Sequence, residues 1–152
     1  MRHLFESGVC AFCTLDSGFN TILWEDEYVS CWAVPDAFMR KELLYHFIIS
    51  PKCHVRKESE LSQSEVLSIA KAHQYLDAAY QLKGGITATR FGDMRLNAGT
   101  VPHLHTNVMV PNGTGEVKIP VFKDPSSREK NVVRAREFGT RYEGGWVPDS
   151  SM

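Results

Sequence analysis

The chain has 152 residues, the size of one domain, and a core of that size needs no disulfide bonds. Its 17 Lys and Arg nearly balance 18 Asp and Glu, and the net charge of -1 excludes a basic nucleic-acid-binding surface over the whole chain. No apolar run approaches the roughly 18 residues of a membrane span, and the N-terminus lacks the apolar core of a signal peptide. We therefore expect a cytoplasmic protein with no membrane partner and no sequence-specific nucleic-acid partner.

The predicted strands come mainly from the N-terminal half. Apolar segments rich in β-branched and aromatic residues, bounded by polar turns, are typical of strands. Four such segments occur, the first of which holds two strands around a polar turn: 21–34, 43–50, 86–91 and 103–110.

One helix is expected over residues 62–83. Ser62 and Glu65 form a capping box, in which each side chain satisfies a free amide at the start of the helix. An apolar stripe then recurs at helical spacing and consists of Val66, Ile69, Ala70, His73, Leu76 and Tyr80. Gly84 and Gly85 are expected to end the helix, because glycine tolerates the left-handed conformation there.

The C-terminal part is predicted to be more polar. Residues 112–123 are expected to form an extra hairpin, because Asn-Gly favours tight turns, and residues 125–138 a charged surface helix. All elements together predict an α+β fold, an antiparallel sheet of about five strands with one main helix packed on it. We expect one domain, with residues 1–124 as its catalytic part and residues 125–152 as its C-terminal helix and tail.

Cys10 and Cys13 form a C-x-x-C pair near the N-terminus. By itself such a pair indicates a metal site, a redox pair or two buried thiols. The segment that follows reads as a loop, which disfavours a thioredoxin-like redox site, because that motif lies at the start of a helix.

Several histidines lie in or next to the predicted strands. His103, His105 and Asn107 are expected to share one face of the last strand, because side chains alternate along a strand. Three polar groups in a row suit a metal or phosphate site better than a core. His54, which follows the strand at 43–50, is by itself typical of a surface or packed residue.

Three motifs occur in an order and spacing shared with a known family. They read CAFC, LLYHFIISPKCH and AGTVPHLHTNVMVP. Together they resemble the histidine-triad superfamily, including its galactose-1-phosphate uridylyltransferase branch, over most of the chain. The resemblance implies a histidine-triad-like fold, a nucleotide or dinucleoside polyphosphate substrate, and a homodimer paired through the helix and the neighbouring strand.

The resemblance also implies a structural zinc ion. The ligand set that it carries over is Cys10, Cys13, His54 and His103. These four fill a tetrahedron, and such an ion contributes folding energy rather than catalysis. Cys53 points away from this set if the chain is extended there, and Cys31 is expected in the core.

The implied nucleophile is His105, the middle histidine of the triad. Its imidazole attacks the α-phosphate of a nucleotide and forms a covalent nucleotidyl-histidine. One ring nitrogen must be free to attack, and we expect a backbone carbonyl to hold the other. His46 lies where many members carry a further site histidine, the alternative being a buried histidine of a strand.

The loop before the triad resembles the phosphate-binding segment of the family. Its matching residues are Asn97, Gly99 and Thr100, and Gly99 lets backbone amides approach a phosphate. Arg95 in the same loop is either a phosphate contact or a solvated charge.

Asn107 departs from the family pattern, because the hydrolase branches carry histidine at the third triad position. The uridylyltransferase and dinucleoside polyphosphate phosphorylase branches carry glutamine there. Asn107 donates a hydrogen bond to a phosphoryl oxygen but cannot act as a general acid near neutral pH. This favours a transferase, a phosphorylase or a slow hydrolase. The alternatives are a nucleotide-binding or scaffold protein with little turnover and, less favoured, a zinc-stabilised module without a nucleotide.

Overall fold

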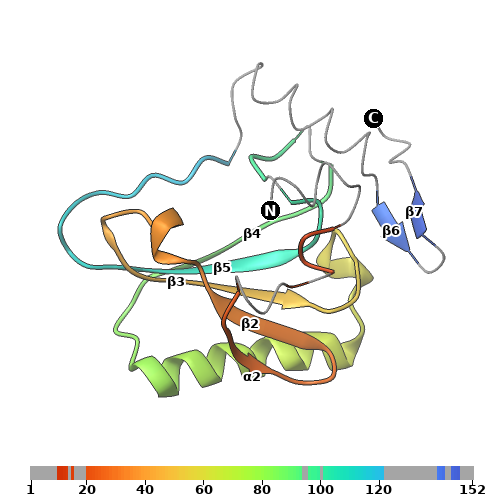
Figure 1. The fold of residues 1–152 in the computed structure, drawn as a ribbon, viewed down its shortest axis with the longest axis horizontal. Helices are drawn as coiled ribbons and strands as arrows, with labels where there is room; N and C mark the ends of the chain where they lie inside the picture. The colour runs from red at the N-terminus through yellow and green to blue at the C-terminus, as the bar shows by residue number, and fades with distance from the viewer. Residues whose placement is uncertain are drawn as a thin grey trace.

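The computed structural model describes residues 10–13, 15, 20–93, 96–99, 101–121, 140–142 and 145–147. Five strands form one antiparallel sheet in the order β1-β2-β3-β5-β4 (Figure 1). Their bounds are Ile22–Glu25 for β1, Val29–Ala33 for β2, Leu43–Pro51 for β3, Ile86–Arg90 for β4 and His105–Pro111 for β5. Two 3-10 helices, η1 (Asp36–Phe38) and η2 (Glu58–Glu60), lie on either side of β3 in the chain, and β6 (Thr140–Tyr142) pairs with β7 (Gly145–Val147) in a separate two-stranded sheet. The predicted α+β fold with a five-stranded antiparallel sheet is confirmed.

Helix α2 (Gln63–Tyr80) covers one face of the sheet and begins at the predicted capping box (Figure 1). The Glu65 amide donates to Ser62 Oγ at 3.2 Å, and the Ser62 amide donates to Glu65 Oε1 at 2.9 Å. The predicted glycine stop is wrong, because Gln81 already takes the left-handed conformation with a φ of 50°. Gly85 has a different reason to be glycine, since a Cβ there would overlap the backbone carbonyl of Met109 on β5.

The buried face of α2 differs in part from the predicted apolar stripe. Its buried residues are Ser68, Ala72 and Leu76, whereas the predicted Val66 and Ala70 are exposed. Ser68 is buried although it is polar, because its hydroxyl donates to the carboxylate of Asp26 in the β1-β2 turn. This hydrogen bond helps to hold a polar residue against the sheet, where apolar spacing alone would not place it.

The two faces of the sheet hold two separate apolar clusters. The cluster under α2 consists of Val29, Cys31, Phe47, Ile49, Ala72, Leu76 and Val108. The cluster on the opposite face consists of Cys10, Ala11, Phe12, Trp32, Ile48 and Val101. The expected core position of Cys31 is confirmed, and burial raises the pKa of its thiol to about 12. The N-terminal C-x-x-C turn therefore packs on the face that α2 leaves open.

The expected hairpin over residues 112–123 is wrong for the part that the structure describes. Residues 112–121 form no strand; residues 116–121, called here the strap, run on the side of the sheet opposite α2 (Figure 1). Arg40 donates to the Lys118 carbonyl, and Arg90 donates to the Pro120 carbonyl through Nη2 at 2.9 Å. Arginine side chains thus take the place of a partner strand, and Pro120 has no amide to offer to one.

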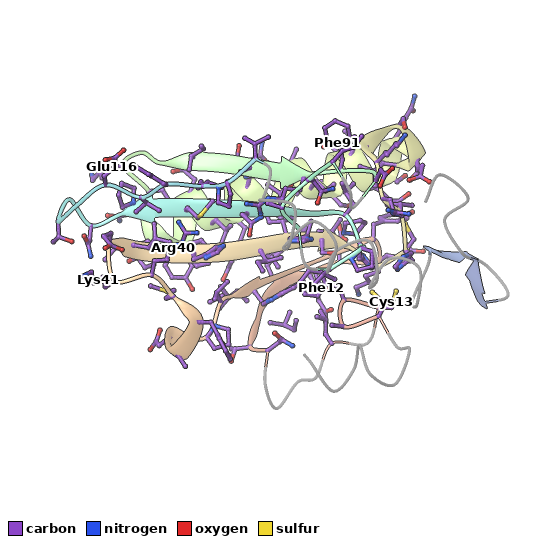
Figure 2. The ribbon with its side chains drawn as sticks, turned by 90° about the horizontal axis from the view of Figure 1, so that it is seen from above. Phe12, Cys13, Arg40, Lys41, Phe91 and Glu116 are labelled. Atoms are coloured by element: carbon purple, nitrogen blue, oxygen red, sulfur yellow. The ribbon has the colours of Figure 1, made fainter. Side chains whose placement is uncertain are left out.

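The strap begins at the end of the sheet where Arg40 and Lys41 lie. Figure 2 shows Glu116 there and Phe91 at the opposite end. The predicted helix at 125–138 and the tail after residue 147 lie outside the described residues. In the described part of the chain, no helix combines the length and the apolar character that crossing a bilayer requires.

Candidate active site and metal centre

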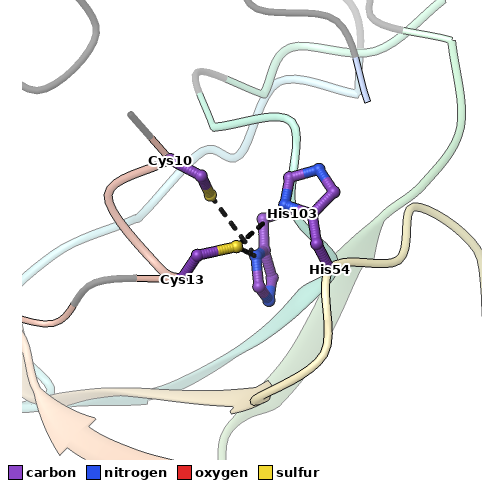
Figure 3. A group of neighbouring side chains, drawn as sticks. All are labelled: Cys10, Cys13, His54 and His103. Carbon is purple, nitrogen blue, oxygen red and sulfur yellow. Dashed lines mark hydrogen bonds between the residues drawn. The ribbon is translucent and has the colours of Figure 1, made fainter. Parts of the chain in front are cut away.

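Four side chains from three separate segments converge beside the C-x-x-C turn (Figure 3). They are Cys10, Cys13, His54 and His103, and their ligand atoms all lie within 4.8 Å of one another. Cys13 Sγ lies 3.1 Å from His54 Nδ1 and 3.5 Å from His103 Nδ1, and Cys10 Sγ lies 3.4 Å from His103 Nδ1. A tetrahedral zinc ion with bonds of about 2.3 Å to sulfur and 2.0–2.1 Å to nitrogen separates these atoms by about 3.6 Å. The donor set and its spacing therefore fit zinc.

The ring of His103 is oriented by a second hydrogen bond. Its Nε2 lies 2.8 Å from the Pro51 carbonyl, so Nε2 carries the proton and Nδ1 presents its lone pair to the cluster. A ligating histidine commonly has such a carbonyl partner on its far nitrogen. His103 precedes β5, which begins two residues later than predicted, so strand alternation does not set its position. Its ring nevertheless lies on the same side of the sheet as His105, because Phe12 contacts both rings, with centroids 6.0 and 4.8 Å apart.

The cluster favours the thiolate form of Cys10. Polar contacts with Cys13, His103 and His54 lower the pKa of the Cys10 thiol to about 2, although burial acts in the opposite direction. The thiolate is the form that binds a metal. Cys53 is exposed and lies against the Glu65 carboxylate, outside the cluster, as its predicted orientation implies.

His105 begins β5 on the face opposite α2. Its Nδ1 lies 2.8 Å from the His103 carbonyl, the kind of partner that the sequence predicts. Nδ1 therefore carries the proton, and Nε2 keeps the lone pair. Burial lowers the pKa of His105 to about 4; the hydrogen bond to the carbonyl opposes this shift, while His103 and Arg90 add to it. The imidazole is therefore neutral near pH 7.

Phe12, the third residue of CAFC, packs against the His105 ring. The two ring centroids lie 4.8 Å apart and the rings are nearly perpendicular, at 89°. Phe12 also contacts Trp32 edge-on, with centroids 5.1 Å apart. The turn that presents the two thiols thus also supports the candidate nucleophile, a contact that the spacing of CAFC does not reveal.

Asn107 lies on the same face as His105 and is buried. Its Oδ1 lies 3.0 Å from His46 Nε2, and its Nδ2 donates to the Ala88 carbonyl at 3.3 Å. The carbonyl of Ala88 fixes which end of the amide is the donor, so His46 Nε2 must donate to Oδ1. Burial lowers the pKa of His46; Asn107 opposes the shift and Arg40 adds to it. The half-buried His46 is thereby tied to the third triad position.

The loop before the triad is closed by the side chain of Asn97. Its Nδ2 donates to the carbonyls of Phe91 and Asp93, both at 3.2 Å, and its Oδ1 accepts the Gly99 amide at 2.8 Å. The Gly99 amide thus has an internal partner, and the expectation that Gly99 lets backbone amides approach a phosphate stays a prediction. Arg95 and Thr100, also predicted to contact substrate, lie outside the described residues.

Two arginines that the sequence analysis did not single out line a small hollow beside His105. Arg56 is buried and its Nη2 donates to the Gly92 carbonyl at 2.8 Å. Arg90 is the register partner of His105 on the neighbouring strand β4. Both line the hollow together with His103, His105, Asn97 and Gly99. Only the β4-β5 register brings residue 90 beside residue 105, and no sequence spacing signals it.

Comparisons with known proteins support the fold. No protein-family model matches the chain, and no curated protein matches it. A solved HIT (histidine-triad) family hydrolase from Clostridium thermocellum is 25% identical, with a TM-score of 0.56 over 72% of this chain and 96% of that one.

Two further solved structures share the fold at lower identity. A histidine triad nucleotide-binding protein from Candida albicans is 16% identical, with a TM-score of 0.55 over 82% of this chain and 92% of that one. A zinc-bound histidine triad family protein from Mycobacterium smegmatis is 20% identical, with a TM-score of 0.51 over 85% of this chain and 92% of that one. The chain therefore has the fold of histidine-triad proteins, while the uridylyltransferase branch stays a prediction.

Proposed function

We propose that the chain is a nucleotide-processing enzyme of the histidine-triad type, which cleaves or transfers a nucleotidyl group at the α-phosphate through His105. The observation that carries the proposal is the 2.8 Å hydrogen bond between His105 Nδ1 and the His103 carbonyl. It leaves Nε2 as the nucleophilic atom of a neutral ring. The solved neighbours described as a hydrolase and as a nucleotide-binding protein support the same class.

The proposed reaction has two displacements at one phosphorus atom. In the first, His105 Nε2 forms a bond to the α-phosphorus, and the P–O bond to the leaving group breaks with its electron pair. In the second, water or inorganic phosphate attacks the same phosphorus, the P–N bond breaks and His105 regains its lone pair. The proton of an attacking water passes to solvent.

Asn107 favours a leaving group that needs no proton. A carboxamide is not a general acid, whereas a phosphate leaving group departs as an anion near pH 7 because its second pKa is about 6. One N–H of Asn107 is held by the Ala88 carbonyl, and the other is the donor that we assign to a phosphoryl oxygen. His46 positions the amide through Oδ1. These features favour a dinucleoside polyphosphate hydrolase or phosphorylase.

A zinc ion is the metal that we assign to Cys10, Cys13, His54 and His103. Four protein ligands leave no position for substrate, so the metal supplies structural closure. The ring of His103 belongs to this cluster, and its backbone carbonyl accepts the hydrogen bond from His105 Nδ1. The cluster thereby helps to position the nucleophile.

A trapping experiment tests the proposal. The protein is mixed with diadenosine tetraphosphate labelled at the α-phosphorus, or with its uridine counterpart, and quenched in base, which preserves a phosphohistidine. We expect label on the wild-type protein and none on His105→Ala. The matched control is His73→Gln, which alters another half-buried histidine that lies on α2. This variant is expected to keep the label. Label on His105→Ala would contradict the assignment.

Product analysis separates the remaining alternatives. Adding inorganic phosphate yields a nucleoside diphosphate if the enzyme is a phosphorylase and leaves the products unchanged if it is a hydrolase. Tight nucleotide binding with neither label nor product would identify a nucleotide-binding protein without turnover and would contradict the proposed enzymatic function.

We also propose that the chain pairs as a homodimer through α2 and β4. Val66 and Leu67 on the outer face of α2 and Ile86 on β4 are all more than half exposed, and β4 is an edge strand of its sheet. Sedimentation is expected to give the mass of two chains, and Leu67→Glu the mass of one. A monomeric wild-type protein would contradict the pairing.

A further inference from the structure

A pocket of about 460 Å³ lies beside the candidate active site, between the end of β4, the loop that follows it and the strap. We call it the strap pocket. Its apolar wall includes Phe91, Leu96, Ile119 and Val121. Phe91, Leu96 and Val121 are 61%, 67% and 81% exposed, so the pocket presents apolar side chains to whatever enters it. Its volume falls within the range of about 300–1,000 Å³ that is typical of small-molecule sites.

The strap pocket adjoins the hollow at His105. The two spaces share four lining residues, which are Arg90, Phe91, Gly92 and Asn97. Arg90 is also the register partner of His105 across the β4-β5 ladder. Arg90 therefore borders both His105 and the strap pocket.

Arg90 supplies a positive charge at the junction of the two spaces. Its Nε and Nη2 both lie within hydrogen-bonding distance of the Pro120 carbonyl, at 3.3 and 2.9 Å. Among the residues that the structure describes, no carboxylate pairs with this half-buried guanidinium. Burial lowers the pKa of Arg90, and nearby Arg40 lowers it further, because the charge is poorly compensated. An anionic ligand would provide that compensation.

We propose that the strap pocket is the leaving-group subsite, and that it binds a nucleoside joined to the scissile phosphorus through a phosphate chain. This inference rests on the proposed function and specifies its substrate as one with a nucleotide leaving group. The phosphate chain lies against Arg90 and the flat base against Phe91, with Leu96 and Val121 around it. When the P–N bond to His105 forms, the leaving nucleotide takes the electron pair of the broken P–O bond, and Arg90 offsets the new charge.

The test compares two substrates that share one nucleotidyl group. Diadenosine tetraphosphate has a nucleotide leaving group, whereas adenosine 5′-phosphoramidate has a small one without phosphate or base. The measured quantity is the ratio of their kcat/KM values. We expect this ratio to fall about tenfold or more in Phe91→Ser, because one apolar contact is worth roughly 10–200-fold in discrimination. A uridine series run in parallel covers the choice of base.

Two further variants make the comparison specific. Phe38→Ser removes an aromatic ring that is 65% exposed and lies outside the strap pocket, so it keeps the wild-type ratio. Arg90→Gln lowers the ratio, whereas Arg90→Lys, which keeps the charge, retains most of it. A ratio that is the same in Phe91→Ser and in Phe38→Ser would overturn the proposal.

A binding measurement keeps this inference separate from the proposed function. ATP, the leaving product, is titrated by calorimetry into protein already saturated with AMP. We expect Phe91→Ser to weaken ATP binding about tenfold and Phe38→Ser to leave it unchanged. If neither substrate reacts but this Phe91-dependent binding is present, the subsite stands and the enzyme proposal fails. If ATP binding is absent or independent of Phe91, the subsite is wrong whatever the activity.

Discussion

The face of the sheet under α2 is apolar, whereas the opposite face carries the ionisable side chains of the candidate site. Under α2, Phe47 and Tyr80 lie with their ring centroids 4.8 Å apart, and Leu76 is fully buried. On the other face, His105 and Asn107 come from the same strand, β5, that sends Val108 under the helix. Because side chains alternate along β5, this one strand places polar residues on the site face and an apolar residue under the helix.

This difference shows that the two faces are stabilised by different interactions. Burial of apolar area stabilises the helix face and tolerates small changes of geometry. The site face also buries an apolar cluster, but it depends in addition on directional contacts, such as the His46–Asn107 hydrogen bond and the Cys2His2 cluster, in which each partner has a defined place. Variants on the two faces should therefore fail in distinguishable ways.

Loss of the metal is expected to have the largest effect on stability. Cys13→Ser, or wild-type protein in a strong chelator, should lose the proposed zinc ion and unfold at least about 10 °C lower, because a metal bound by this cluster would contribute folding free energy. Elemental analysis and thermal unfolding measure both changes. Cys53→Ser is the control, since that exposed thiol is outside the cluster. Unfolding that is unaffected by the chelator would contradict the metal centre.

Leu76→Ala tests the helix face. The cavity that it leaves should cost about 2–5 kcal/mol in urea unfolding, because Leu76 is fully buried beneath α2. Zinc content should stay at the wild-type value. Leu44→Ala, at an exposed leucine of β3, should change stability by about 0.5 kcal/mol or less. Parallel loss of zinc in Leu76→Ala would show that the two faces are not independent.

Asn107→Ala tests the polar bridge on the site face. It leaves the His46 ring N–H and the Ala88 carbonyl without their partner, which should cost about 1–3 kcal/mol. Nitrogen chemical shifts of the His46 ring should then show a changed balance of tautomers. Asn112→Ala alters an exposed asparagine and should leave these shifts as they are. His46 shifts that do not respond to Asn107→Ala would refute the bridge.

The hydrogen bond between Ser68 and Asp26 gives the smallest effect and depends on pH. Burial tends to raise the pKa of Asp26, but hydrogen bonds from Ser68, Tyr28 and Val29 outweigh it and hold the pKa below its usual 3.8. The stabilisation is therefore complete above pH 3.8 and is lost as the pH falls through the lower folded-state value.

Ser68→Ala should accordingly cost about 1 kcal/mol at pH 7. The difference from wild type should shrink progressively as unfolding is measured at pH values below 3.8. Ser64→Ala, an exposed serine of the same helix, should show neither effect. A difference that is constant with pH would mean that Asp26 is not the partner that matters.

Local patterns predicted much of this molecule. The capping box at Ser62 placed the start of α2 correctly, and the apolar run at residues 43–50 predicted β3 nearly to its ends. The four members of the Cys2His2 cluster were named from a family resemblance, and the structure brings them together. These features depend on short-range chemistry or on motifs.

Features that depend on long-range pairing were not predictable. Arg90 lies beside His105 through the β4-β5 register, and Arg40 and Arg90 donate hydrogen bonds that hold the strap along the sheet. The buried face of α2 includes Ser68, which apolar spacing does not predict and whose hydroxyl donates to the Asp26 carboxylate. Each of these features involves a polar contact between segments far apart in the sequence. Hydrophobic periodicity gives no information about such contacts.

Among the described residues, the hydrogen bonds that hold the strap are accepted by its main-chain oxygens, at Lys118 and Pro120. Because the acceptors are main-chain carbonyls, these hydrogen bonds do not depend on which side chains the strap carries. Residues such as Ile119 and Val121 can therefore change in evolution without loss of these hydrogen bonds. Such changes would alter the shape of the pocket wall. Related chains could diverge in the molecules they accept without redesigning the strand that carries His105.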